Sequence, residues 1–314
     1  MCFSAQVRQD LHHYERQFGA RIDTPAFERL YRARLIDNKV RIPKALDANW
    51  APGSDIGQLA SAYNQSRTRE LEAELFKQKR RLGDAERTLQ NRSTKAAAES
   101  RRIATGKVEG LLSRITDLKR VEAIPDDSRI FPFWYTPALV ADGGQLLVRP
   151  MRYHCRPAGK PESYDRKYDG LYNARRDNLE GFWKGQFGNS HAVLVLTGFF
   201  ENVARHDLER RPLAPGETSA NVVLHFRPRA GGDMLVAALW SHWESSGRES
   251  LDSVALITDD PPAEVAAAGH DRCPVPLKAA NVAAWLEPAG AEPGALHALL
   301  DDRERPYYEH RLAA

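Results

Sequence analysis

The segment 61–122 constrains the fold most strongly, because it contains no proline and almost no aromatic side chains. Leucines recur in it at steps of four and seven residues, which is the spacing of one face of a helix. A polar break at 91–94 divides the pattern, and helical spacing resumes with Leu111, Ile115 and Leu118. The segment therefore predicts an antiparallel helical hairpin.

This predicted hairpin is basic. Between Arg67 and Glu122 it holds 15 Lys and Arg residues against 9 Asp and Glu, whereas the whole chain has a formal net charge of +3. A charged helical surface is usually a solvated one, and that is the first interpretation. The second is an arm that contacts phosphate groups or recruits a protein partner.

The rest of the chain changes character along its length. Helical spacing predicts helices within 3–37, with a break at Gly19. Later segments favour short strands, namely 130–135, 138–141, 145–148, 192–196, 222–225, 234–238 and 253–258. Because the strands are grouped and do not alternate regularly with helices, we expect an α+β fold and not a doubly wound sheet. We expect a single domain over residues 1–314, with the helical insertion at about 61–122.

Composition and cysteine usage narrow the function classes. The 314 residues are 42% hydrophobic, which suffices for a core, and the 45 basic and 42 acidic residues nearly cancel. Cys2, Cys155 and Cys273 are too scattered for a disulfide framework, and no Cys/His cluster has zinc-ligand spacing. We therefore expect neither a metal nor a cofactor. No apolar run suits a signal peptide or a membrane span, which predicts a cytoplasmic protein without a membrane partner.

The first two residues, Met1-Cys2, offer unusual chemistry. A small second residue generally permits removal of the initiator methionine, which would leave Cys2 with a free α-amine. The amine (pKa about 7.7–8.0) and the thiol (pKa about 8.5) would then form a 1,2-aminothiol, in which two nucleophiles can attack one electrophile in turn. A cysteine at this position is nevertheless more often an ordinary small residue at a terminus.

Three polar clusters follow later in the chain. Asn173 and Arg175 lie in Tyr172-Asn173-Ala174-Arg175-Arg176, where amide and guanidinium groups beside an aromatic ring suit a phosphodiester, although a plain surface loop also fits. Glu201 follows the apolar strand 192–196, so its carboxyl group is either partly desolvated and suited to proton transfer or already in solvent. His270, in Gly269-His270-Asp271-Arg272-Cys273-Pro274, is either a proton shuttle or one half of a structural pair with its Asp neighbour.

Taken together, four motifs resemble the SOS-response-associated peptidase (SRAP) family. In chain order they are the N-terminal Cys, the Asn-Ala-Arg, the Gly-Phe-Phe-Glu and the His-Asp-Arg followed by Pro. The segment Ala237-Ala238-Leu239-Trp240 is similar to the family's Ala-Gly-Leu-Trp strand. The resemblance covers Met1-Cys2 and roughly 130–288, and it leaves residues near 40–125 unexplained. It implies a mixed or antiparallel, bifurcated or barrel-like sheet flanked by helices.

The resemblance also implies an activity. Proteins of this family bind single-stranded DNA that contains an abasic site and link to it through the N-terminal cysteine, forming a thiazolidine with the ring-opened sugar aldehyde. Cys2 would play that part here, Asn173 would hold the cysteine end and the sugar, and Glu201 would assist proton transfer. His270 would promote Schiff-base chemistry and crosslink reversal, and Arg175 would grip a phosphate. A role in the DNA damage response, with nucleoid association and peptidase activity, follows from the same resemblance.

This sequence departs from the family pattern in two places. The family usually continues Met-Cys-Gly-Arg, whereas Phe3-Ser4 stand here, which removes one expected contact. Where a Trp-Gly-Leu-Pro-like stretch is usual, the chain reads Met-Arg-Tyr-His-Cys-Arg-Pro over residues 151–157. Stacking on DNA is therefore assigned to Tyr153, and Arg152 and Arg272 are further candidates for DNA contacts.

Two other classes of function stay open at this stage. One is an N-terminal-nucleophile thiol hydrolase or autoprotease that does not act on DNA, with Cys2 as nucleophile and Glu201 or His270 as assistant. The other is a non-catalytic DNA-binding or scaffold protein that relies on the basic hairpin, and it predicts strongly salt-dependent binding that survives loss of Cys2.

Overall fold

The computed structural model describes residues 3–313. These divide into two compact units, one formed by Met1–Asn49 with Pro125–Ala314 and the other by Trp50–Ile124. We name them the sheet unit and the hairpin unit. No helix within residues 3–313 is long and apolar enough to span a bilayer.

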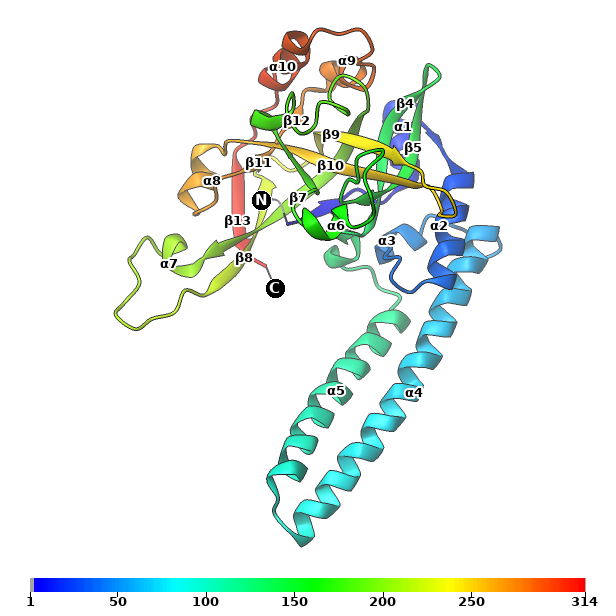
Figure 1. Ribbon diagram of the computed structural model, residues 1–314, viewed down its shortest axis with the longest axis vertical. Helices are drawn as coiled ribbons and strands as arrows, with labels where there is room; N and C mark the ends of the chain where they lie inside the picture. Colours follow the sequence, from blue (N-terminus) through cyan, green and yellow to red (C-terminus); the bar gives the residue numbers. More distant parts are fainter. Residues whose placement is uncertain (1–2, 314) are drawn as a thin grey trace. The chain divides into compact units, whose positions relative to one another are not determined.

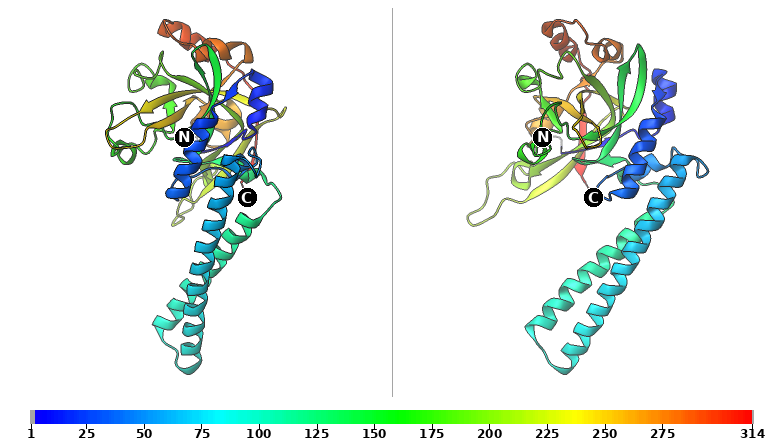
Figure 2. Two further views of the ribbon diagram at one scale, coloured as in Figure 1. Left: turned by 90° about the vertical axis from the view of Figure 1, so that its right-hand side faces the viewer. Right: turned by 45° about the vertical axis from the view of Figure 1, so that its right-hand side comes forward.

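The hairpin unit consists of α4 (Asp55–Asn91) and α5 (Lys95–Lys119), which pack antiparallel (Figure 2). Ser54 caps α4 by accepting a hydrogen bond from the Gly57 amide, and Thr94 caps α5 in the same way through the Ala97 amide. The buried contact between the helices is made by the predicted apolar residues, namely Leu71, Leu111 and Ile115, with Leu75 and Leu118 at its margin. The predicted hairpin is confirmed, and its first helix begins before residue 61.

Ion pairs along the hairpin neutralise part of its charge. Arg67 pairs with Glu70 and Arg102 with Glu99 at spacings of three residues, each with 2.6 Å between nitrogen and oxygen. Lys119 of α5 reaches Glu72 of α4 at 2.9 Å. These side chains are exposed, so each pair contributes little to stability. They favour the first interpretation of the basic segment, a solvated helical surface.

Thirteen strands within residues 3–313 form one mixed sheet in the sheet unit, with the order β12-β9-β10-β5-β4-β7-β1-β3 along its main path (Figure 1). The strands are β1 (Ser4–Val7), β2 (Arg21–Ile22), β3 (Arg129–Ile130), β4 (Tyr135–Asp142), β5 (Gln145–Tyr153), β6 (Asn173–Arg175), β7 (His191–Ala204), β8 (Asn221–Pro228), β9 (Met234–Trp243), β10 (Leu251–Asp259), β11 (Cys273–Pro274), β12 (Pro276–Leu277) and β13 (Tyr308–Leu312).

Short helices accompany the sheet in the same unit. They are α1 (Leu11–Phe18), α2 (Thr24–Ile36), α3 (Lys44–Asp47), α6 (Tyr164–Lys167), α7 (Arg205–Leu208), α8 (Ala263–Ala267), α9 (Val282–Leu286) and α10 (Pro293–Asp301). Three turns of 3₁₀ helix, η1 (Pro125–Ser128), η2 (Arg176–Asn178) and η3 (Ala279–Asn281), complete it. The predicted α+β class is confirmed.

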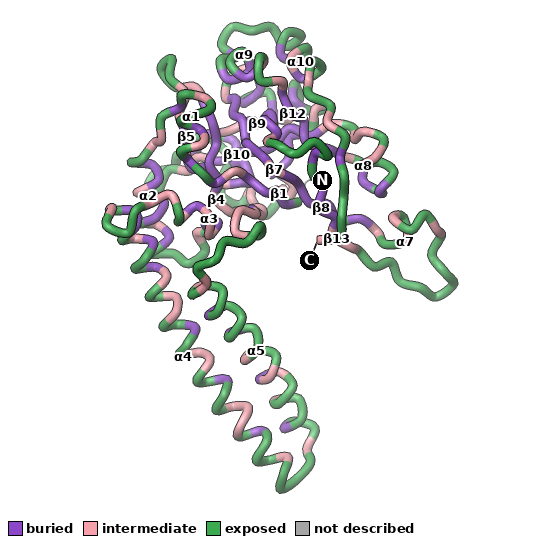
Figure 3. The backbone as a smooth tube through the Cα atoms, turned by 180° about the vertical axis from the view of Figure 1, so that it is seen from behind, coloured by how far each residue is buried: buried purple, intermediate pink, exposed green. Residues whose placement is uncertain are grey.

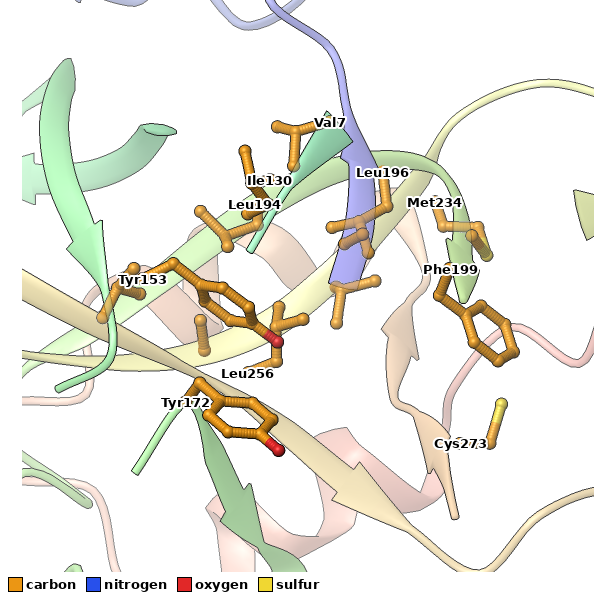
Figure 4. Close-up of a cluster of buried hydrophobic side chains, with 14 of the residues drawn as sticks. Val7, Ile130, Tyr153, Tyr172, Leu194, Leu196, Phe199, Met234, Leu256 and Cys273 are labelled. Carbon is orange, nitrogen blue, oxygen red and sulfur yellow. The ribbon is translucent and has the colours of Figure 1, made fainter. Parts of the chain in front are cut away.

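The long strand β7 runs through the middle of this unit and pairs with β1, β4, β8 and β9. Leu194, Leu196 and Phe199 of β7 lie in one buried cluster with Val7 of β1 and Leu256 of β10 (Figure 4). The buried stretches of backbone concentrate on these central strands, as Figure 3 shows. A side chain on β7 is therefore held by neighbours on both sides.

Three sequence-based boundaries were wrong. The strand predicted at 130–135 is interrupted, because β3 ends at Ile130 and β4 begins at Tyr135. Residues Ser4–Val7 form a strand and not the start of a helix, because antiparallel pairing with β7 and β3 buries all four of them and overrides local helical spacing. The strand predicted at 192–196 continues to Ala204. Glu201 therefore lies inside β7 and not after it.

His191, at the start of β7, is a buried neutral histidine. Its Nδ1 lies 2.8 Å from the Trp285 carbonyl oxygen, and the Gly188 amide donates a hydrogen bond to its Nε2 at 2.9 Å. The carbonyl requires a proton on Nδ1 and the amide requires a lone pair on Nε2, so only the neutral ring satisfies both. Burial lowers the pKa of His191 to about 4.

Acidification should destabilise the protein through this ring. A histidine in the unfolded chain has a pKa near 6.5, so the unfolded state takes up the proton first, and stability falls as the pH drops below that value. We expect His191→Gln to remove about 2 kcal/mol of the difference in unfolding free energy between pH 7 and pH 5. Denaturant unfolding at both pH values measures this, with exposed His310→Gln as control. An unchanged pH dependence in His191→Gln would contradict the assignment.

Candidate functional site

The carboxyl end of β10 brings two of the predicted clusters together. Thr258 of β10 pairs with Arg175 of β6 on one side and with Pro274 of β11 on the other. The segment that contains Asn173 and Arg175 and the loop that contains His270 therefore flank the same strand end. Gly269 turns the chain from α8 into this loop with φ of 92°, a conformation that a side chain would disfavour.

Glu201 and His270 form a buried pair. The Glu201 side chain is fully buried, and its carboxyl oxygen lies 3.0 Å from Nε2 of His270. Burial raises the pKa of Glu201, while the hydrogen bond and charge of His270 act in the opposite direction. The net raised pKa favours the neutral acid, which is the form that can donate a proton.

The other ring nitrogen of His270 contacts the Arg272 backbone. Nδ1 lies 3.0 Å from the Arg272 carbonyl oxygen and 3.3 Å from the Arg272 amide nitrogen. Nδ1 therefore has both an acceptor and a donor within reach on the Arg272 backbone, so either ring tautomer has a partner there. These contacts hold the ring with Nε2 directed at the Glu201 carboxyl group.

Asn173 of β6 is buried, and it pairs with Leu256 of β10. The hydrogen bonding of its side chain is unusual. Neither the oxygen nor the nitrogen of its amide has a hydrogen-bond partner among the described residues. A buried amide in this state costs free energy, and such groups in native proteins call for an explanation. A bound group that accepts and donates hydrogen bonds would supply one.

The first two described residues, Phe3 and Ser4, contact residues that adjoin Asn173 and Glu201 in the sequence. The Phe3 ring meets the Tyr172 ring edge-on with 6.4 Å between centroids, and Ser4 pairs with Phe200 in the ladder between β1 and β7. Phe3 is therefore next to the residue before Asn173, and Ser4 is next to the residue before Glu201. Cys2, the predicted nucleophile, lies outside the described residues.

The two outer arginines have acidic neighbours. Arg175 is half exposed and donates to Asp177 at 2.8 Å, and this pairing lowers the pKa of Asp177. The Arg272 side chain is largely buried, and its nearest carboxylate oxygens, on Asp260 and Asp271, lie 3.9 Å and 4.0 Å away. Arg175 is thus the more accessible of the two cations.

Arg152 and Tyr153 do not present free surfaces. Arg152 donates to Asp165 at 2.8 Å and to the His154 carbonyl oxygen, and Arg156 binds the same carboxylate. Tyr153 is fully buried in the central cluster, where Figure 4 shows its ring beside that of Tyr172. A base has no access to a ring in this position, so the assignment of Tyr153 to DNA stacking is corrected.

Arg129 is a site neighbour that the sequence analysis missed. Its guanidinium donates to the Ser4 hydroxyl through Nε at 3.1 Å and through Nη2 at 2.9 Å, and it lies over the Phe200 ring at 3.7 Å. It forms no ion pair with any described residue, and burial lowers its pKa. No sequence motif marks it, because the contact depends on long-range pairing between β1 and β3.

The other cysteines are poor nucleophiles. Cys155 and Cys273 are both buried as free thiols, and burial raises the pKa of each, that of Cys155 to about 12. Thiolates are the reactive form, so neither thiol is activated. Within residues 3–313 no group of three or more His, Cys, Asp or Glu side chains could hold a metal ion.

Comparison with known proteins bears on the same region. The family model described as SOS response associated peptidase (SRAP) matches residues 86–312, a range that includes Asn173, Glu201 and His270 and excludes Cys2. None of the curated proteins matches the chain.

Solved structures give weak similarities. A protein from Bacteroides thetaiotaomicron is 14% identical with a TM-score of 0.47, over 60% of this chain and 78% of that one. A protein from Bordetella bronchiseptica is 16% identical with a TM-score of 0.46, over 62% and 90%. A phage-related protein from the same organism is 18% identical with a TM-score of 0.44, over 62% and 84%.

The neutral state of Glu201 can be tested by stability. Its raised pKa means that the folded state holds the proton more tightly than the unfolded state, in which the pKa is about 4.3. The stabilisation is complete below that value and is lost as the pH rises through the folded pKa. We expect Glu201→Gln, which imitates the neutral acid, to become progressively more stable relative to the wild type as the pH rises from 4.5 to 8.

Unfolding midpoints in urea across this pH range provide the measurement. Glu201→Leu is the matched variant, because it leaves Nε2 of His270 without its partner, and it should cost about 1–3 kcal/mol at every pH. If Glu201→Gln were instead as destabilised as Glu201→Leu at pH 8, the carboxyl group would be an ionised partner of His270.

Proposed function

Because this chain belongs to the SOS response associated peptidase family, we propose that it captures abasic sites in single-stranded DNA covalently through Cys2. Family membership implies a DNA partner and peptidase or crosslinking chemistry. The observation that carries the finer proposal is the buried pair of Glu201 and His270 next to the described start of the chain. Asn173, whose amide has no hydrogen-bond partner among the described residues, follows Tyr172, the residue that the Phe3 ring contacts.

The chemistry of a terminal cysteine suits an aldehyde. The α-amine of Cys2 attacks C1′ of the ring-opened sugar, and the carbonyl oxygen takes up a proton to give a carbinolamine. The hydroxyl group is protonated and leaves as water, which forms the imine. The thiol sulfur then attacks the imine carbon, and the thiol proton passes to the nitrogen, so that a five-membered thiazolidine forms with net release of one water.

The described residues supply the proton transfers that this sequence needs. Glu201 as a neutral acid donates the proton that lets the hydroxyl group depart, and Nε2 of His270, 3.0 Å away, is placed to receive or return it. The Asn173 amide would bind the cysteine end and the sugar. Arg175, half exposed at the strand end, would bind a phosphate of the damaged strand.

Replacement of Cys2 gives the direct test. We expect Cys2→Ala to form no stable adduct with a single-stranded oligonucleotide that carries one abasic site, as measured by intact mass and by denaturing gel. The variant keeps its α-amine, so borohydride should still trap an imine with the same oligonucleotide. An adduct that persists in Cys2→Ala without borohydride would refute the role of the thiol.

Two controls accompany this test. An uncleaved residue placed before Cys2 converts the Cys2 amine into an amide, so the thiazolidine cannot form and the stable adduct should be abolished. His270→Gln should slow adduct formation about 100-fold, as expected for loss of a proton-transfer group, with the final yield preserved.

A thiol hydrolase that acts on peptides is the second candidate, and the family's description as a peptidase favours it. The same α-amine, thiol and Glu201–His270 pair would serve nucleophilic attack on an amide carbonyl. Release of a peptide by the wild type, lost in Cys2→Ala and unaccompanied by any DNA adduct, would select this function over capture.

A further inference from the structure

The outer face of the sheet carries a basic hollow that the capture reaction does not use. Its volume is about 920 Å³, and its lining includes Gln6 of β1, Thr197 of β7, His225 and Arg227 of β8, and Arg311 of β13. All of its lining residues belong to the sheet unit. We name it the outer hollow.

Strand register explains why these side chains meet. Ser4 pairs with Phe200, Phe200 with His225, and His225 with Arg311, so one row crosses β1, β7, β8 and β13. Side chains alternate between the two faces of a strand, so Phe200 and its row lie on the face opposite Phe199 and Glu201. At a strand spacing of about 4.8 Å, the row extends about 14 Å from Ser4 to Arg311.

The row is a stack of flat groups with positive charge at both ends. The Arg129 guanidinium lies 3.7 Å from the centre of the Phe200 ring, and the Phe200 and His225 rings stack at 4.2 Å with an interplanar angle of 11°. Arg227 lies two residues after His225 on β8, on the same face of the strand, and it is exposed. Neither Arg227 nor Arg311 forms an ion pair with any described residue.

The acidic neighbours leave this charge uncompensated. Glu309, the strand partner of Arg227, is bound by Arg229 at 2.6 Å. Asp10, the other carboxylate in the lining, is bound by Arg16 at 3.2 Å. Arg227 and Arg311 therefore face the hollow with no carboxylate of their own.

His225 provides an independent sign of a ligand site. It is only 4% exposed, and its Nε2 has no hydrogen-bond partner among the described residues. Burial, followed by the charges of Arg227, Arg311 and Arg129, lowers the pKa of His225 to about 4, so the ring is neutral near pH 7. A neutral imidazole can donate one hydrogen bond to an anionic oxygen.

Gly198 keeps this nitrogen accessible from the strand beside it. A Cβ atom at residue 198 would lie 2.5 Å from Nε2 of His225 and 2.8 Å from the Phe226 carbonyl oxygen. Any side chain would therefore collide with the floor of the hollow.

We propose that the outer hollow binds the phosphodiester backbone of a DNA single strand, with Arg227 and Arg311 on phosphate oxygens and His225 as a further donor. Arginines contact phosphates without reading bases, which suits a surface whose exposed cations have no carboxylate partner. The row begins at Ser4, two residues from Cys2 in the sequence, so the strand would be a continuation of the one captured there. The inference rests on the proposed function and extends it from the damaged nucleotide to its flanking strand.

The test uses intact single-stranded DNA, which has no aldehyde to capture. Binding of a fluorescent 20-residue oligothymidylate is measured by anisotropy over a range of salt concentrations, for the wild type and for the double variant Arg227→Gln/Arg311→Gln. We expect the variant to bind about tenfold more weakly at low salt and its salt slope to fall by about 1.4, the value for two lost phosphate contacts to a single strand. Unchanged affinity and slope would overturn the proposal.

A charge-matched double variant controls for net charge. Arg29→Gln/Arg305→Gln also removes two exposed cations, outside the hollow. If it weakened binding as much as the first variant, a diffuse charge effect would replace the site. Inorganic phosphate is added in a second arm at ionic strength matched with chloride, and displacement of the oligonucleotide by millimolar phosphate would assign the hollow to a small anion instead.

Covalent capture separates this proposal from the proposed function. With an abasic oligonucleotide at saturating concentration, Arg227→Gln/Arg311→Gln should reach the wild-type yield of adduct, because Cys2, Glu201 and His270 are unchanged. If the wild type captured abasic DNA, and Arg227→Gln/Arg311→Gln bound intact strand as tightly as the wild type, the outer hollow alone would be refuted. Binding of intact strand without any capture would refute the role of Cys2 and leave the hollow standing.

Discussion

The arrangement of the site depends on one buried carboxyl group, that of Glu201 inside the long strand β7. Glu201 has no exposed surface, and an ionised carboxylate there would lose its hydration. The protein meets this cost by pairing the group with His270 and by favouring the neutral acid. The loop around His270 must then stay close to β7, which explains why β10, β11 and the turn at Gly269 are arranged around that contact.

The two faces of β7 separate two kinds of chemistry. Glu201 belongs to the face that packs against the core, where a low dielectric makes proton transfer between buried groups effective. Phe200, one residue earlier, belongs to the face of Arg129, His225 and Arg311. On that side Arg227 and Arg311 are exposed and form no ion pair with any described residue, so the surface suits an anion and not a reaction. Alternation along one strand is enough to place both within a few residues of Ser4.

Sequence reasoning succeeded where the signal was local. Leucine spacing predicted α4 and α5, because helix packing repeats over neighbouring turns, and the strands predicted at 138–141 and 145–148 lie within β4 and β5. It failed at Ser4–Val7, where burial between β7 and β3 depends on residues more than 120 positions away in sequence. Tyr153 was misassigned for the same reason, since no pattern in 151–157 reveals that the ring is enclosed by other strands.

The candidate site shows the same division. Motif order pointed to Asn173, Glu201 and His270, but it could not decide whether Glu201 was desolvated, because that depends on β7 continuing through it. Nor could it show that Arg129 approaches Ser4, where the family pattern has an arginine of its own. The guanidinium from β3 lies against the Ser4 hydroxyl and over Phe200, so a positive charge adjoins this position although the local sequence lacks it. A motif can therefore lose a charged residue while the site keeps a charge at that position, because a side chain from a neighbouring strand supplies it.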